Sequence, residues 1–152
     1  MFSSIAQVRA NLTQVDIVRM DDTTVTDRIA LADDDIVTDL SKYVNFSLVP
    51  ATGYLDSNFP AWLKRLSQFK SCSHILVKLY GAKRSVDQVS DIQYWDKEYA
   101  DLLNKIKMNM VETILVDGTN ITKGAFTVSV GRQNISPVLE AGNMVSLLVM
   151  LL

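Results

Sequence analysis

The residues best able to do chemistry stand together in one stretch, where Cys72, Ser73 and His74 follow one another. A nucleophile and its base must face each other, and side chains one or two positions apart on a helix do not. A zinc site needs more ligands than the single histidine and single cysteine of this chain supply. We therefore interpret His74 as a hydrogen-bonded, partly buried structural residue and Cys72 as a small hydrophobe. We expect no catalytic site and no cofactor, and thus not an enzyme.

The second candidate is an acidic run, Asp33-Asp34-Asp35, followed by Asp39. Calcium loops place their ligands at alternate positions around a glycine turn. This run has helical spacing instead and contains no glycine. The pattern favours a solvated helix face, with an intersubunit salt-bridge surface and a metal site as the alternatives.

The third candidate is a group of basic residues: Lys64, Arg65, Lys70, Lys83 and Arg84. They could form a solvated rim, or they could make weak, sequence-independent contacts with DNA phosphates. The net charge of −2 and the pI near 5.3 give no general reason to expect affinity for nucleic acid. The pattern therefore favours the solvated rim.

The element that would position these residues is a long helix over residues 59–81. Its core-facing positions recur at alternating steps of four and three: Trp62, Leu66, Phe69, Ser73, Leu76 and Tyr80. Asn58 can serve as its N-cap, and Gly81 can end it. From Cys72 onward the helix is apolar nearly all round, so it needs cover on several sides and should form the centre of a bundle. Its polar, basic face would comprise Lys64, Arg65, Gln68 and Ser71.

Three further helices are predicted around this central one. A short helix over 4–12 would be capped by Ser4 and Gln7, and a second would run from about Val25 to Val44. A third would span about 89–110, with Asp87 or Ser90 as its cap. The chain is thus predicted to be mainly α, a small bundle of about four helices around a central long helix.

The composition changes beyond Glu112, where glycines and β-branched residues become frequent. Ile114–Val116 followed by Asp117-Gly118 is typical of a strand that enters a turn. We therefore divide the chain into a helical domain, 1–112, and a β-rich C-terminal arm, 113–152. The arm's candidate contact residues for a partner are Phe126, Val128, Val130, Val138, Leu139, Met144, Val145, Leu147, Leu148 and Leu152.

The apolar end of this arm needs a partner. Residues 144–152 are fewer than the about 20 that span a bilayer, so we expect no membrane contact. The start of the chain lacks a basic region followed by a long apolar run, so no signal peptide is expected. An uncovered apolar end is instead accounted for if a neighbouring subunit covers it.

The order of these parts resembles one family. An acidic helix IALADDDIVTDL lies at 29–40, a helix start FPAWLK at 59–64, a helix end VKLYG at 77–81 and a last helix with YWDKEYADLL at 94–103. The arrangement resembles that of the head–tail connector proteins of tailed bacteriophages, also called adaptor or head-completion proteins. The resemblance covers roughly residues 4–107.

The resemblance implies a structural virion protein, made in the host cytoplasm and located at the head–tail junction. Its partners would be further copies in a ring, commonly of twelve, the portal protein, and a tail or tail-completion protein. DNA would pass through the lumen without sequence specificity.

The charges of the chain suit such a ring. An acidic face with Asp33, Asp34 and Asp39 could meet a basic face on the next copy, and head-to-tail interfaces of this kind close into rings. The basic face would comprise Lys64, Arg65, Lys83 and Arg84. The alternative function is a small helical DNA-binding or regulatory module without catalysis, which would need one basic stripe along a helix.

Overall fold

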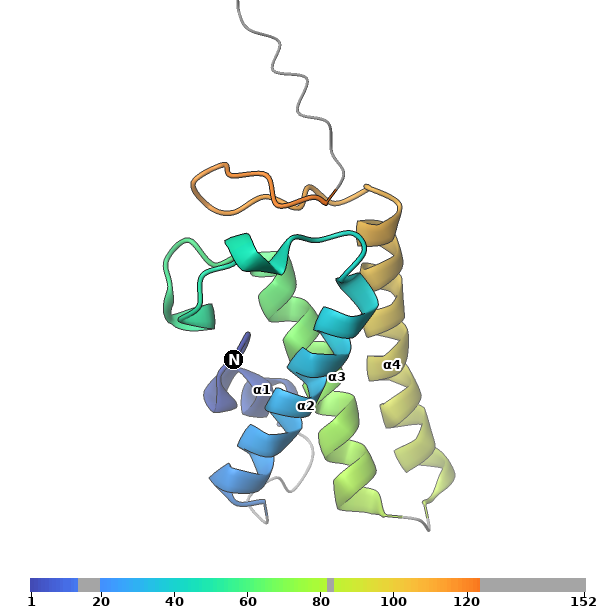
Figure 1. Ribbon diagram of the computed structural model, residues 1–152. Helices are drawn as coiled ribbons and strands as arrows, with labels where there is room; N and C mark the ends of the chain where they lie inside the picture. Colours follow the sequence, from blue (N-terminus) through green and yellow to red (C-terminus); the bar gives the residue numbers. More distant parts are fainter. Residues whose placement is uncertain (14–19, 82–83, 124–152) are drawn as a thin grey trace, which may run out of the picture.

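The computed structural model describes residues 1–13, 20–81 and 84–123, and these residues form one helical bundle (Figure 1). The helices are α1 (Ile5–Asn11), α2 (Asp22–Leu40), α3 (Ala61–Tyr80) and α4 (Val86–Lys107). Two short 3₁₀ helices, η2 (Phe46–Leu48) and η3 (Gly53–Leu55), lie in the connection between α2 and α3. Helix α3 packs against α1, α2 and α4. The predicted mainly helical fold around a central long helix is therefore confirmed for the described residues.

Capping side chains set where the helices begin. Ser4 and Gln7 form the predicted reciprocal capping box of α1. Helix α4 begins earlier than predicted, because Ser85 and Gln88 form a second capping box ahead of both Asp87 and Ser90. Helix α2 begins after Asp21, whose carboxylate accepts a hydrogen bond from the backbone of Thr24.

Asn58 does not cap α3, contrary to the prediction. Pro60 occupies the N-cap position without a side-chain hydrogen bond. The Asn58 side chain instead holds a distant turn: its Oδ1 accepts from the backbone N–H of Asp117 at 2.7 Å, and its Nδ2 donates to the Asp117 carboxylate at 2.9 Å. At the other end of α3, Gly81 adopts φ 64° and ends the helix as predicted.

The core consists of two clusters stacked along α3. The first contains residues of α2, α3 and α4 together with later loops: Ile36, Leu40, Val44, Phe59, Trp62, Leu63, Leu66, Tyr99, Leu103, Ile106, Leu115 and Ile121. The second joins α1 to the other half of α3: Val8, Leu12, Met20, Val25, Ile29, Cys72, Ile75, Leu76 and Ile92. Between them α3 carries buried serines, including Ser67 and Ser71. Ser71 was predicted on the polar, basic face of this helix, and that prediction is wrong because Ser71 is fully buried.

Residues 113–123 belong to the helical core. Leu115 and Ile121 are buried within the first cluster. The predicted turn at Asp117-Gly118 is present, with Gly118 at φ 87°. The predicted strand over 114–116 is reduced to one isolated antiparallel bridge between Ile114 and Asn120. The boundary predicted after residue 112 therefore separates residues that share one core.

The start of the chain is tied into the loop between α2 and α3. The Met1 carbonyl accepts a hydrogen bond from the backbone N–H of Tyr54 at 3.2 Å. The Phe2 ring lies 6.2 Å from the Phe46 ring and 5.7 Å from the Phe59 ring, measured between centroids. Gly53 makes this approach possible, since a Cβ atom on it would lie 1.9 Å from the Met1 carbonyl oxygen.

We predict that Gly53→Ala destabilises the protein more than Gly118→Ala does. Both glycines have positive φ, so both substitutions carry backbone strain, but the space around Gly118 is open. The added cost of displacing Met1 should lower the free energy of unfolding by about 1–3 kcal/mol beyond the control. Urea unfolding of the two variants measures this difference, and equal losses would contradict it.

Candidate interaction surfaces

Asp33 lies inside the fold, so its predicted place on a solvated acidic face is wrong. Its side chain is 8% exposed. Its carboxylate accepts a hydrogen bond from the Ser67 hydroxyl at 2.6 Å and another from the backbone N–H of Phe2 at 2.8 Å. The Ser3 hydroxyl lies 2.8 Å from that of Ser67 and extends the network. This carboxylate thus joins α2, α3 and the start of the chain within one molecule.

The other acids of α2 have separate surroundings. Asp34 is exposed. Asp35 lies 3.6 Å from the Lys70 ammonium. Asp39 accepts a hydrogen bond from the Tyr99 hydroxyl of α4 at 2.6 Å, and Asp39 as a whole remains exposed. Of the three acids predicted at an intersubunit interface, Asp34 and Asp39 therefore remain at the surface.

His74 is the partly buried, hydrogen-bonded residue that the sequence predicted. Its Nε2 atom lies 3.0 Å from the Asp35 carboxylate. Burial lowers the pKa of His74, and the positive charge of Lys70 lowers it further. Cys72 is fully buried, and burial raises the pKa of its thiol to about 12. Such a thiol stays protonated at neutral pH, as expected for a small core hydrophobe.

The predicted basic face is not one surface. Lys64 and Arg65 lie in the first turns of α3, whereas Arg84 follows the other end of the same helix. A helix of 20 residues spans roughly 30 Å, so the two groups lie far apart. The Arg84 guanidinium donates to the Gly81 carbonyl at 2.7 Å. Lys83 lies outside the described residues. No single basic stripe is formed by the part of this set that the structure describes.

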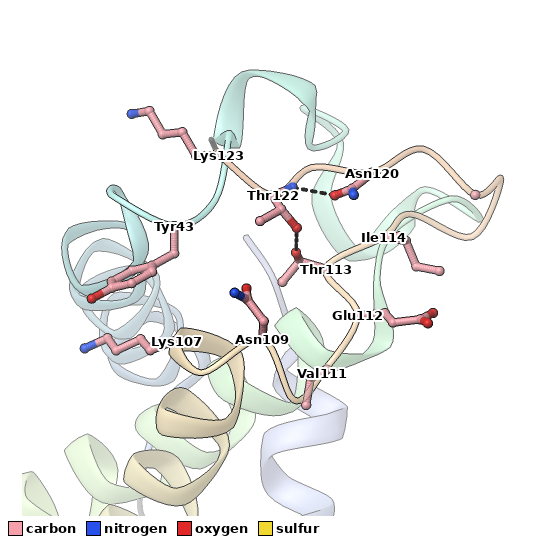
Figure 2. Close-up of a pocket in the computed structure, with 11 residues that line it drawn as sticks. Tyr43, Lys107, Asn109, Val111, Glu112, Thr113, Ile114, Asn120, Thr122 and Lys123 are labelled. Atoms are coloured by element: carbon pink, nitrogen blue, oxygen red, sulfur yellow. Dashed lines mark hydrogen bonds between the residues drawn. The ribbon is translucent and has the colours of Figure 1, made fainter. Parts of the chain in front are cut away.

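A hollow of about 670 Å³ opens at the end of the bundle where α4 finishes. Its wall comprises Tyr43, Lys107, Asn109, Val111, Glu112, Thr113, Ile114, Gly118, Asn120, Thr122 and Lys123. Figure 2 shows Tyr43 and Lys107 on one side of this hollow, with Glu112 and Ile114 on the other. The hydroxyls of Thr113 and Thr122, which both line the hollow, are hydrogen-bonded to each other.

Tyr43 and Ile114 line this hollow and are exposed, and three further exposed apolar residues lie within two positions of a lining residue in the chain. Met108 and Met110 flank the wall residue Asn109 and are 69% and 73% exposed. Val116 is 70% exposed, and Ile114 and Tyr43 are each more than a third exposed. We call these five residues, together with the hollow, the apolar end surface. Isolated exposed hydrophobes are ordinary on a monomer, whereas a gathering around one hollow is typical of a contact site.

The turn that ends α4 leaves Met108 and Met110 exposed. Asn109 adopts φ 55°, and its backbone N–H bonds the Ile106 carbonyl. The N–H of Met110 reaches back to the Lys105 carbonyl at 2.8 Å, which completes a Schellman motif. The chain therefore reverses abruptly after α4, and Met108 and Met110 are left on the outside of the turn.

The predicted contact residues of the arm lie outside the described residues. They are Phe126, Val128, Val130, Val138, Leu139, Met144, Val145, Leu147, Leu148 and Leu152. The described chain ends at Lys123, which lines the hollow.

Within residues 1–13, 20–81 and 84–123, no three His, Cys, Asp or Glu side chains are grouped so that they could hold a metal ion. No helix in that same part of the chain is long and apolar enough to cross a membrane. No protein-family model, curated protein or solved structure matches this chain.

Sequence reasoning missed two sets of residues that organise these surfaces. Ser3 and Ser67 were not identified as partners of Asp33, and the link between Asn58 and Asp117 was not foreseen. Both connect residues far apart in the chain. The local signal at Asn58 was that of a cap residue, and nothing in its neighbouring sequence indicates a partner 59 positions away.

We predict that Asp33→Ala lowers the free energy of unfolding by about 2–4 kcal/mol, because it leaves the buried Ser67 hydroxyl and Phe2 N–H without their acceptor. Asp33→Asn keeps the shape and one acceptor oxygen, so it should cost less at neutral pH. Denaturant unfolding at pH 7 compares the two, and an Asn variant as unstable as the Ala variant would contradict this account.

The same carboxyl predicts a pH dependence of stability. Burial raises the pKa of Asp33 above its ordinary 3.8, although the Ser67 and Phe2 hydrogen bonds oppose the rise. The folded state therefore binds a proton at higher pH than the unfolded chain does. The stability of the natural protein relative to Asp33→Asn should increase as pH falls through the raised pKa, and should level off below about 3.8. Unfolding curves between pH 7 and pH 3 test this, and a difference that stays constant would contradict it.

Proposed function

We propose that this chain is a structural subunit of an oligomeric ring that joins the portal of a bacteriophage head to the tail, with DNA passing through the lumen. The family resemblance suggests the particle, and the apolar end surface is the observation that carries the proposal. Met108, Met110 and Val116 are exposed at one end of the monomer. When another protein covers them, the free energy falls because apolar surface is removed from water.

Contacts between copies would be heterologous in this ring. Asp34 and Asp39 on α2 are the exposed acids available to one face, and Lys64 and Arg65 at the start of α3 supply the basic partner face. Asp33 is not part of this interface, because its carboxylate is satisfied within its own chain. Closed rings follow when such a head-to-tail contact repeats with a fixed rotation. Twelve copies are the number that the resemblance implies.

The rest of the proposal follows from the same resemblance. One face of the ring would receive the portal protein and the other a tail or tail-completion protein. A β-rich arm within residues 113–152 would supply contacts to a neighbouring subunit or to the portal. The proposal requires no catalysis and no cofactor, and it places the mature protein in the virion.

We predict that the full chain forms a particle of many copies and that removal of residues 144–152 prevents its assembly. The deletion leaves residues 1–123 intact, so the far-ultraviolet circular dichroism of the helical bundle should be preserved. Light scattering gives the particle mass of each form, and electron micrographs of the full chain should show rings.

Val86→Ser provides the control for this experiment. Val86 is 85% exposed at the opposite end of α4, so its substitution should leave both the fold and assembly unchanged. A full chain that stays monomeric at high concentration, or a truncated chain that assembles normally, would contradict the proposed function.

A further inference from the structure

The apolar end surface has the features of a receptor for an apolar segment. Tyr43, Val111 and Ile114 form the apolar part of a wall that otherwise consists mostly of polar and charged residues, and the volume of about 670 Å³ can hold several aliphatic side chains. Met108 and Met110 are the chain neighbours of the lining residue Asn109 and are largely exposed, and methionine side chains adapt readily to the shape of an apolar partner. Within one copy, the described residues leave the apolar end surface partly exposed.

The sequence itself contains a segment of matching chemistry. Residues 144–152 read Met-Val-Ser-Leu-Leu-Val-Met-Leu-Leu, with one polar residue and no charge. Glu140, shortly before it, is the single charged residue between 138 and 152. Lys107 and Lys123 line the hollow and offer that carboxylate an opposite charge at the rim.

We propose that the Met144–Leu152 segment of one copy docks on the apolar end surface of the next copy. This inference rests on the proposed function and names the surface that receives the arm. The connection is long enough for exchange between copies: residues 124–143 can span up to roughly 70 Å, about twice the length of α4. Each copy then gives one segment and receives another, which is the repeating, heterologous contact that closes a ring.

A disulfide trapping experiment tests the pairing. Ile114→Cys is placed in one copy and Val145→Cys in a second copy that carries a different affinity tag. The natural Cys72 can stay, because it is fully buried and its pKa is raised to about 12. After the two proteins are mixed and mildly oxidised, a covalent heterodimer should form. Its yield should exceed that of a Val86→Cys and Val145→Cys pair about tenfold, since docking raises the effective concentration of the two thiols.

A substitution in the receiving surface gives an independent readout. Ile114 is 36% exposed and lies outside the helices, so Ile114→Asp should lower the thermal unfolding temperature of the bundle only modestly. It should nevertheless reduce assembly as strongly as removal of residues 144–152 does, because a carboxylate would be buried under the docked segment. Val86→Asp introduces the same carboxylate at the 85% exposed residue at the opposite end of α4, so it is the matched control and should assemble normally.

The outcomes separate this inference from the proposed function. If large particles form but the 114–145 pair crosslinks no better than the Val86 control, the docking surface is wrong while the ring proposal stands. Normal assembly of Ile114→Asp would overturn the docking surface in the same way. If a chain carrying both cysteines crosslinks only within itself and remains a monomer, both the exchange between copies and the ring proposal fail.

Discussion

The burial of α3 on three sides is the constraint on which the rest of the structure depends. Leu63, Leu66, Ile75 and Leu76 are fully buried along this helix. A helix with apolar side chains on several faces cannot be stable alone in water, so α1, α2 and α4 must each cover one of its faces. Val77 lies on a part of α3 that these three helices do not cover, and it is two-fifths exposed. The arrangement of the bundle follows from this requirement.

A polar layer between the two core clusters fixes how these helices meet. A carboxylate such as that of Asp33 is costly to bury, and the Ser67 hydroxyl and Phe2 N–H offset the cost only in one relative position of α2, α3 and the chain start. Ser73 of α3 makes a similar link to α4 by donating to Asp96 at 2.6 Å. Apolar packing alone tolerates sliding of one helix along another, whereas these directional bonds do not. The layer therefore gives the bundle a defined register.

The two ends of the bundle differ in a way that bears on function. Around the start of α4, the exposed hydrophobes Val77, Val86 and Val89 are interspersed with polar residues. Around its end, a Schellman turn and the folded segment 113–123 carry the more exposed Met108, Met110 and Val116 and contribute residues to a hollow. His74 is partly buried and hydrogen-bonded to Asp35, and Cys72 is fully buried. The proposals above assign the apolar end surface to contacts with further copies of the chain.

The sequence by itself determined the local features of this protein. The 3.6-residue spacing of apolar side chains predicted the helices, Ser4 with Gln7 predicted the first capping box, and Gly81 predicted the end of α3. These features depend on residues at most four positions apart, so local pattern is enough to find them. Tertiary structure alone decided the fate of side chains whose partners are distant. Asp33 and Ser71 lie in the interior, and the side chain of Asn58 bonds the turn at Asp117 instead of capping α3. Leu115 and Ile121, from the segment 113–123, are buried in the helical core. The hydrogen bonds of Asp33 and Asn58 join residues 31 to 59 positions apart, and a polar residue gives no local sign of whether such a partner will come to satisfy it.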